Sequence, residues 1–242
     1  MKDAQKQYDY KVETHLHTSQ ASACGISTGA DMARANKFGG CCAIVVTDHF
    51  FNGNTAIRGD EYSKYSWEDK ISLFVRGYED AKKEGYKIGL DVYFGFEYNY
   101  KGAEFLIYNF PEENLLAYPE IMTDPIETVL TKIRQEGGFV IHAHPFRVAS
   151  YIPTPVKLFP EHTDAVEVIN TQNSNEANRL ALEYAKKHGL IQFGGSDTHS
   201  AYPQDGGMLF WRKPESICDM MDMAKNGEYE ILGEQYLGGD EI

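Results

Sequence analysis

The stretch that decides the fold is KVETHLH, residues 11–17, which reads as the first strand of the chain. His15 and His17 lie one residue apart near its end, and side chains two positions apart on a strand point to the same side of a sheet. Two imidazoles on one side can bind one metal ion. If this strand end belongs to a metal site, further histidines and carboxylates should follow other apolar strands.

Other polar motifs do lie at the ends of apolar runs. CCAIVVT, residues 41–47, is a continuous apolar run of the kind found in strands buried on both faces of a parallel sheet, and Asp48 and His49 follow it. The same arrangement recurs at the strands that we expect over 88–98, 139–141 and 190–193. The side chains concerned are Glu97, His142, His144, Asp197 and His199. Random placement would scatter them over helices and loops, so we predict a polynuclear metal site built from strand ends.

Helical periodicity separates these strands. It predicts helices over 28–38, over 67–84 with Gly85 as its end, after Asp124-Pro125 with Asp124 as the N-cap, and over 177–185 before Gly189. Strands that alternate with helices predict parallel β-α units. A closed barrel brings its strand ends round one mouth, whereas an open sheet spreads them along an edge. The polar motifs therefore favour an irregular α/β barrel of about seven strands.

Two connections depart from a simple β-α alternation. A strand over 103–110 should pair with the strand over 88–98 through a tight turn at Asn99–Gly102. The polar segment over 50–66 is longer than an ordinary connection, which is typical of a functional loop.

Length, charge and cysteine content describe a single acidic domain. The 242 residues carry a formal net charge of −13, and 42% of them are apolar. We expect one domain over 1–242, with a core at about 11–210 and a C-terminal extension at 211–242. A strongly acidic chain repels nucleic-acid backbones and anionic membranes. The four cysteines show no disulfide spacing, and neither a signal peptide nor a membrane span is visible, so we expect a cytoplasmic location.

The residue types in the polar motifs define the chemistry that they permit. Imidazole and carboxylate ligands suit Zn, Mn or Fe. A carboxylate such as Glu97 or Asp197 can bridge two ions, and paired ions about 3.5–4 Å apart favour in-line displacement at phosphorus by a hydroxide formed from bound water. The sequence contains no G-x-S-x-G elbow, no P-loop and no dinucleotide fingerprint, so the main rival chemistries have no motif.

Five motifs together resemble those of the PHP (polymerase and histidinol phosphatase) family. In chain order they are His15-x-His17, Thr47-Asp48-His49, Gly95-Phe96-Glu97, Ala143-His144-Pro145 and Gly195-Ser196-Asp197-Thr198-His199. The similarity runs from about residue 11 to residue 210. It implies a distorted (βα)7 TIM-like barrel with two or three divalent metal ions at its C-terminal mouth.

The resemblance also implies a role for each ligand. His15 and His17 would hold the first ion with Glu97 and Asp197, Glu97 would bridge to a second ion bound by His144, and His49 and His199 would hold a third. Two family positions differ here. One family ligand falls at Ser22–Gly25, where only Cys24 could replace it, although a small buried residue is the more ordinary role for that cysteine. A family histidine aligns with Glu104, and the third site is therefore in question.

The implied activity is that of a metal-dependent phosphoesterase. A phosphatase would hydrolyse a small phosphomonoester, such as a histidinol-phosphate-like, sugar or nucleotide phosphate. The catalytic residues would be Asp197, His199 and His49, with either histidine as the proton donor. Arg147 is either a phosphate clamp or an ordinary loop arginine.

Two alternatives remain beside the phosphatase interpretation. One is a nuclease or phosphodiesterase, against which the acidic charge and the lack of a basic, aromatic stripe count. The other is a non-catalytic domain that binds metal and senses a phosphorylated ligand. We expect His142 to support a ligand or the core, Asp48 to orient His49, and His162 and His188 to lie on the surface. The sequence does not determine the oligomeric state.

Overall fold

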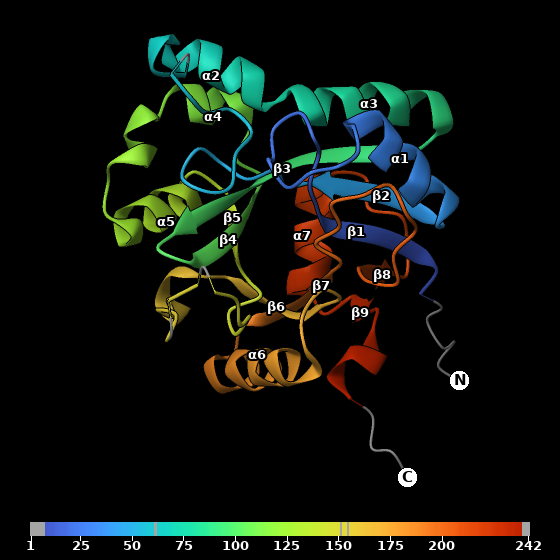
Figure 1. Cartoon of the computed structure of the whole chain (residues 1–242). Helices are drawn as coiled ribbons and strands as arrows, with labels where there is room; N and C mark the ends of the chain where they lie inside the picture. The colour runs from blue at the N-terminus through green and yellow to red at the C-terminus, as the bar shows by residue number, and fades with distance from the viewer. Residues whose placement is uncertain (1–7, 61, 151, 154, 239–242) are drawn as a thin grey trace, which may run out of the picture.

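The computed structural model describes residues 8–60, 62–150, 152–153 and 155–238, and these contain one nine-stranded sheet. Its strands lie in the order β7-β6-β5-β4-β3-β2-β1-β8-β9. They are β1 (Tyr10–Leu16), β2 (Cys41–Val46), β3 (Asp91–Tyr100), β4 (Ala103–Tyr108), β5 (Phe139–Ala143), β6 (Ala165–Asn170), β7 (Ile191–Gly195), β8 (Met208–Phe210) and β9 (Tyr229–Ile231). The sheet curls so that β6 and β7 come back toward β1 (Figure 1).

The sheet is a nearly closed barrel because the chain after β7 bonds to β1. The backbone N–H of His17 donates to the carbonyl of Thr198 at 2.9 Å, and Thr14 Oγ1 donates to the carbonyl of Gly194 at 2.6 Å. The ends of β1 and β7 therefore meet, and the polar motifs that follow them come to the same mouth.

The strand directions show how the barrel differs in detail from the distorted (βα)7 barrel that the resemblance implies. The β1–β2, β2–β3, β5–β6 and β6–β7 pairs are parallel, as the β-α alternation predicts. However, β4 is antiparallel to both β3 and β5, because the tight turn after Tyr100 returns the chain directly. The short strand β8 is antiparallel to β1 and β9. The fold is a mixed α/β barrel, and a regular (βα)7 arrangement is not what this sheet shows.

Helices surround the strands, except α7, which lies near the middle of the view (Figure 1). They are α1 (Gly29–Phe38), α2 (Trp67–Phe74), α3 (Arg76–Ile88), α4 (Glu112–Leu116), α5 (Ile126–Gln135), α6 (Asn175–His188) and α7 (Ile217–Lys225). The pair α1 and α3 packs with β1 and β2 through Leu16, Met32 and Ala81. An aromatic-rich cluster joins α2, α4 and α5 to β3 and β4, and α6 covers β6.

The helix α7 belongs to a core cluster shared with the barrel strands. Met220, Met221 and Met223 are buried there with Leu106 and Phe193. The polar motifs lie at the opposite ends of the parallel strands, where β1, β2, β5 and β7 finish. One end of the barrel is thus packed with apolar side chains, and the other carries the candidate site.

Two helix predictions are wrong in detail. The helix expected over 67–84 is two helices that meet at Val75, and α3 runs past Gly85 to end at Gly89, whose φ is 67°. Gly85 lies inside α3, where a Cβ would be only 2.6 Å from the carbonyl oxygen of Leu90. A glycine at this position therefore allows close packing and does not end the helix. At α5 the N-cap residue is Pro125, and Asp124 accepts a hydrogen bond from Tyr118 Oη at 2.7 Å.

Candidate metal centre

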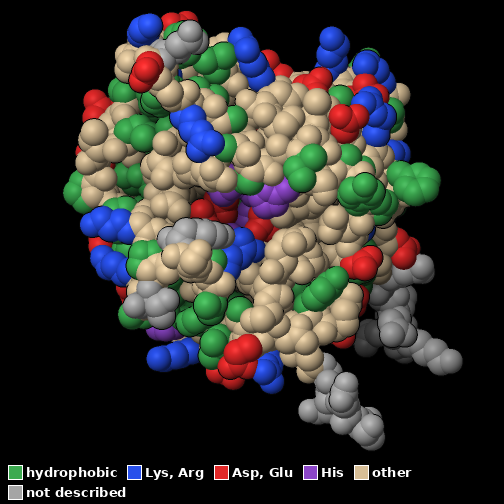
Figure 2. Space-filling model, viewed as in Figure 1, with side chains coloured by type: hydrophobic (Ala, Val, Ile, Leu, Met, Phe, Trp, Pro, Cys, Tyr) green, Lys and Arg blue, Asp and Glu red, His purple; other side chains and the backbone are tan. Residues whose placement is uncertain are grey.

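The polar strand ends surround a pocket of about 580 Å³ at the mouth of the barrel. Acidic and histidine side chains gather in this hollow near the middle of the face seen in Figure 2. The residues that line it are Cys24, His49, Asn52, Gly53, Asn54, Glu97, Asn99, Glu104, Arg147, Asp197 and His199. His15, His17 and His144 lie beneath these residues and are buried.

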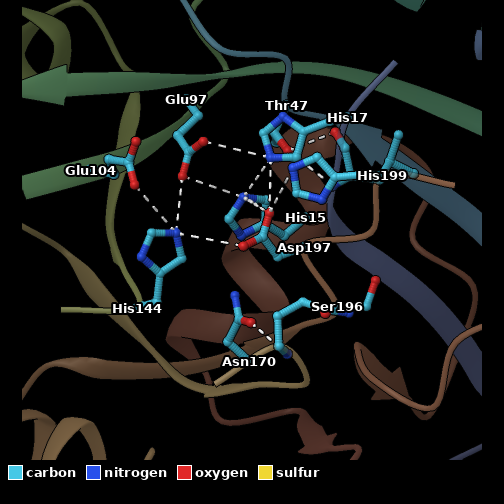
Figure 3. A network of polar contacts seen from close by, with 12 residues as sticks. His15, His17, Thr47, Glu97, Glu104, His144, Asn170, Ser196, Asp197 and His199 are labelled. Carbon is cyan, nitrogen blue, oxygen red and sulfur yellow. Dashed lines mark hydrogen bonds and ion pairs between the residues drawn. The ribbon is translucent and has the colours of Figure 1, made fainter. Parts of the chain in front are cut away.

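The first set of ligand atoms, here named the β1 group, consists of His15, His17 and Asp197. His15 Nε2 lies 3.2 Å from His17 Nε2, and Asp197 Oδ1 lies 3.4 Å and 3.0 Å from these two atoms. Glu97 Oε1 is 3.4 Å from His15 Nε2. All four side chains are buried and converge on one point, as Figure 3 shows.

The second set, the Glu104 group, consists of His49, Glu97 and Glu104. His49 Nδ1 lies 2.7 Å from Glu97 Oε2 and 4.0 Å from Glu104 Oε1. His144 Nε2 lies 3.2 Å from Glu97 Oε1 and 3.7 Å from Glu104 Oε2. Glu97 therefore faces both groups: Oε1 lies near His15, and Oε2 lies near His49 and, at 3.6 Å, near His17. This arrangement suits a bridging carboxylate.

The third set, the histidine triplet, consists of His17, His49 and His199. The ring of His17 stacks on that of His49 at 4.4 Å and on that of His199 at 4.6 Å. His199 Nε2 is 3.9 Å from Asp197 Oδ1. The structure thus brings together all the predicted ligands, including Glu104, around one pocket.

Two of the candidate ligands occupy unusual backbone conformations. His144 has φ 28° and Asp197 has φ 52°, in a region that non-glycine residues rarely adopt. Buried acids hold the adjoining peptide groups. Glu167 Oε2 accepts the N–H of His144 at 3.1 Å, and Glu13 Oε1 accepts the N–H of Ser196 at 3.0 Å.

Glu13 and Glu167 are functional candidates that sequence reasoning missed. Glu167 Oε1 also lies 2.9 Å from His15 Nδ1, so it fixes the ring that presents Nε2 to the centre. Glu13 Oε1 accepts the N–H of His15 at 2.9 Å as well. Their signal in the sequence was an acid inside a strand, at a position that faces the barrel interior.

Asp48 supports the centre by a different route from the one expected. Its carboxylate accepts hydrogen bonds at 2.6 Å from the N–H and hydroxyl of Thr18 and from the hydroxyl of Ser22. Ser22 Oγ in turn accepts the backbone N–H of His49 at 3.0 Å and lies 3.2 Å from His17 Nδ1. Asp48 therefore orients the two histidines through Ser22, and the His49 ring faces Glu97 instead.

The electrostatics of the centre favour positive charge. Burial lowers the pKa of His15, but the charges of Glu167, Asp197 and Glu97 outweigh burial and raise the pKa well above its usual value. Burial also lowers the pKa of His49, but its neighbours, Glu97 most strongly, outweigh burial and raise the pKa well above its usual value. By contrast, burial and the nearby His49 lower the pKa of His17 to about 3.

The residues present fit divalent metal ions. Glu97 Oε2 and His49 Nδ1 are buried 2.7 Å apart, yet neither makes a hydrogen bond of good geometry. Carboxylate and imidazole donors converge at distances suited to shared cations, and the same field that draws protons onto His15 and His49 would be satisfied by a cation.

The other predicted residues take distinct places. Cys24 is half-buried and lines the pocket, so it is not a core residue. Burial raises the pKa of its thiol, but contacts with His199 and His49 outweigh burial and lower it to about 6. Arg147 also lines the pocket, and its Nη2 lies 2.6 Å from Asp197 Oδ2.

Three histidines lie outside the centre. The buried ring of His142 stacks on Phe105 at a centroid distance of 4.8 Å, and burial lowers its pKa to about 3. It therefore supports the core. His188 is exposed, and His162 is partly exposed on a short turn.

The fold and the site together define a class of protein: a mixed α/β barrel whose mouth carries side chains able to bind metal ions. A family model for PHP-associated sequences matches residues 175–202, the segment from α6 through the Asp197 motif. A comparison with curated proteins found no match. The family match covers two of the predicted ligands, Asp197 and His199.

Solved structures share the fold. A two-domain protein from Bacteroides vulgatus, which contains a predicted PHP-like metal-dependent phosphoesterase, is 17% identical over 92% of this chain with a TM-score of 0.65. This chain spans 64% of that protein's length. A Bifidobacterium adolescentis protein assigned as a metal-dependent phosphoesterase is 16% identical over 90% of this chain and 95% of its own, with a TM-score of 0.54.

An amidohydrolase from Chromobacterium violaceum, solved with sulfate and no metal, is 13% identical over 93% of this chain and 99% of its own, with a TM-score of 0.52. At these identities the structures establish a common fold. Together with the family match they confirm the resemblance to the PHP family. None of the described helices is long and apolar enough to cross a membrane.

Proposed function

We propose that this chain is a metal-dependent phosphoesterase that hydrolyses a small phosphomonoester. The observation that carries the proposal is the convergence of the β1 group, the Glu104 group and the histidine triplet round one pocket. Ions bound there would act as Lewis acids and lower the pKa of a coordinated water. His15, His17, Glu97, His144 and Asp197 are the residues that would hold them, with His49, His199 and Glu104 nearer the pocket.

Arg147 is the residue suited to bind the phosphate. Burial lowers the pKa of its guanidinium, but Asp197 raises it above its ordinary value, so the side chain keeps its charge. Nε donates to Asn173 Oδ1 at 2.8 Å and Nη2 to Asn170 Oδ1 at 3.0 Å, which fixes the planar group at the pocket wall. These bonds and the contact with Asp197 occupy Nε and Nη2, so Nη1 is the nitrogen that would donate to a phosphoryl oxygen.

In a centre whose third ion is absent, His199 would be the residue suited to deliver a proton to the leaving group. Its ring is part-exposed in the pocket, whereas His15 and His17 are fully buried. Burial lowers the pKa of His199, but Cys24 and Asp197 outweigh burial and raise it above the usual value. His49 is the second residue in reach of the pocket.

The walls of the pocket favour a small polar substrate. Asn52, Asn54 and Asn99 line it beside the ligands, and no aromatic ring is among its described lining residues. Amide groups hydrogen-bond to hydroxyl or amino substituents of a short phosphomonoester. The described lining residues include no Phe, Tyr or Trp and so form no base-stacking platform of the kind that nucleic-acid enzymes use, which supports the phosphatase over the nuclease.

The direct test is release of p-nitrophenol from p-nitrophenyl phosphate by chelated protein and by the same protein refilled with Mn²⁺ or Zn²⁺. We expect turnover only after refilling, loss of turnover in Asp197→Ala, and wild-type turnover in the matched control His188→Ala, whose ring is exposed. Full turnover of Asp197→Ala at normal metal content would refute the proposal.

The same assay separates the alternatives. Release from bis-p-nitrophenyl phosphate but not from the monoester would identify a phosphodiesterase. A sensor would bind metal and inorganic phosphate but would hydrolyse neither of these two esters. It would also hydrolyse none of a panel of sugar and amino-alcohol phosphates.

A further inference from the structure

We propose that Cys24 supplies a thiolate ligand to a cation held by His49 and His199, which makes this position of the centre a mixed sulfur–nitrogen site suited to Zn²⁺. The inference rests on the metal-binding part of the proposed function and not on phosphoester hydrolysis. It concerns a residue type that the β1 group and the Glu104 group lack.

The histidine triplet provides the nitrogen ligands. One ring nitrogen from each of its members lies within 4.8 Å of the others. His17 faces the β1 group, since its Nε2 lies 3.0 Å from Asp197 Oδ1. His49 and His199 instead open onto the pocket, where a third donor is needed to complete a site.

The loop over 22–26 is fastened to the backbone or ring of each member of the triplet. Ser22 Oγ lies 3.2 Å from His17 Nδ1 and accepts the N–H of His49 at 3.0 Å. The N–H of Ile26 donates to the carbonyl of His199 at 2.8 Å. The residue midway between Ser22 and Ile26 is therefore held beside the open side of the triplet.

That residue is Cys24, and its thiol contacts the side chains of both His199 and His49. The neighbouring peptides are fixed, because the N–H of Ala23 donates to the carbonyl of Asn54 at 2.8 Å. Gly25 packs so closely on the backbone of residue 18 that a Cβ would not fit. The thiol is thus positioned by a rigid loop and lines the same pocket as the two histidines.

The donor chemistry distinguishes this position from the rest of the centre. Two imidazoles and one thiolate form a set typical of zinc sites, whereas carboxylate-rich sets also suit Mn and Mg. The other cysteines do not compete for it. Cys41 and Cys42 lie on β2, away from the pocket, and exposed Cys218 lies within hydrogen-bond distance of Asn109.

The test uses the full chain, stripped by chelation and refilled with Co²⁺ alone. We expect a near-ultraviolet thiolate-to-cobalt charge-transfer band in the wild type, loss of that band in Cys24→Ser and in Cys24→Ala, and a full band in the matched control Cys218→Ser. A second measurement needs no variant. Peptide mass spectrometry after treatment with iodoacetamide should show that Zn²⁺ blocks alkylation of Cys24 and leaves alkylation of Cys218 unchanged.

Two results would overturn the assignment. One is cobalt bound without the band, and the other is a band that survives in Cys24→Ser. Unprotected alkylation of Cys24 in zinc-loaded protein would overturn it as well. None of these readouts uses turnover, so a band in a protein that hydrolyses no phosphate ester would leave this inference standing while the phosphoesterase proposal fails.

Discussion

Glu167 contacts two of the candidate ligands through its two carboxylate oxygens. One oxygen lies 2.9 Å from His15 Nδ1, and the other accepts the N–H of His144 at 3.1 Å and a hydrogen bond from Asn170 Nδ2 at 2.9 Å. The side chain is buried, so these contacts are shielded from bulk water. At the scale of single residues, such an acid sets the orientation of the ligands, and Glu167 also lies within reach of an ion shared with His15 and His144.

We expect Glu167→Ala and Glu167→Gln to weaken metal binding by about 10–100-fold, the usual cost of losing a partner of a histidine ligand. The alanine removes the contact with His15, and the glutamine places an N–H donor where the His144 N–H needs an acceptor. Competition with a chromophoric chelator measures the affinity. Exposed Glu183→Gln, on the helix that covers β6, is the control and should bind as the wild type does; equal affinities in all three variants would contradict the prediction.

The neighbours His142 and His144 should behave oppositely. His144 faces Glu97 and Glu104, whereas the buried ring of His142 packs on Phe105 and Tyr184, and neither of its nitrogens has a hydrogen-bond partner. We expect His144→Ala to lose metal and activity and His142→Phe to keep both. Metal analysis of the two purified variants decides the point, and metal loss in His142→Phe would reverse the assignment.

His142 also predicts a pH dependence of stability. Burial lowers its pKa to about 3 in the folded protein, against 6.5 as the ordinary value. The unfolded chain therefore binds more protons between these pH values, so this contribution to stability is present above pH 6.5 and is lost as the pH falls through that window. Between pH 7 and pH 5 the wild type should lose about 2 kcal/mol more free energy of unfolding than His142→Phe. Urea unfolding of both proteins at pH 7 and at pH 5 measures these losses. An equal loss of stability in the two proteins would refute the prediction.

At the scale of elements, α3 lies directly against the segment that follows β1. Gly77 on α3 packs on Thr18, and a Cβ there would lie 2.7 Å from Asp48 Oδ2 as well. Asp48 is the acid that holds Ser22, which contacts two members of the histidine triplet. Helix packing and ligand orientation therefore meet at this glycine.

Gly77→Ala should cost about 1–3 kcal/mol of stability, the range for overpacking a filled core. It should also weaken metal binding, because the extra methyl group displaces Thr18 and Asp48. Lys83→Ala, at an exposed position of the same helix, should change stability by less than about 0.5 kcal/mol. Thermal unfolding and chelator competition test both effects, and a Gly77→Ala variant as stable as the wild type would show that the contact yields without cost.

The sequence predicted elements better than it predicted their contacts. Apolar runs followed by polar motifs identified the strand ends, and the structure brings those side chains together because parallel strands finish at one mouth. The predicted end of α3 at Gly85 was wrong, because Gly85 packs closely against Leu90, and no local sequence pattern encodes that contact. Glu13 and Glu167 were missed because the sequence of a short strand does not show that an acid facing the barrel interior will accept hydrogen bonds from backbone N–H groups of a loop distant in sequence.

At the scale of the whole molecule, the barrel separates an apolar end from a charged one. Methionines of α7 pack with the barrel strands in one apolar cluster, while Glu13, Glu97, Glu104, Glu167 and Asp197 are all buried near the other end. Five buried carboxylates among histidines repel one another unless cations compensate them. The net charge of −13 adds to that repulsion, so stability of the whole chain should depend on metal.

Removal of metal should therefore lower the melting temperature of the entire domain. An ion at 100 times its Kd stabilises the folded state by about 2.7 kcal/mol, and only the folded state assembles the three groups of ligands. For a chain of this length that free energy corresponds to a shift of roughly 5–11 °C. Scanning calorimetry with Zn²⁺ or Mn²⁺ against excess chelator measures it, and Asp197→Ala should show a much smaller shift because it lacks a ligand of the β1 group. A wild-type melting temperature that ignores the chelator would mean that the buried acids are balanced by protons on His15 and His49 instead of by metal ions.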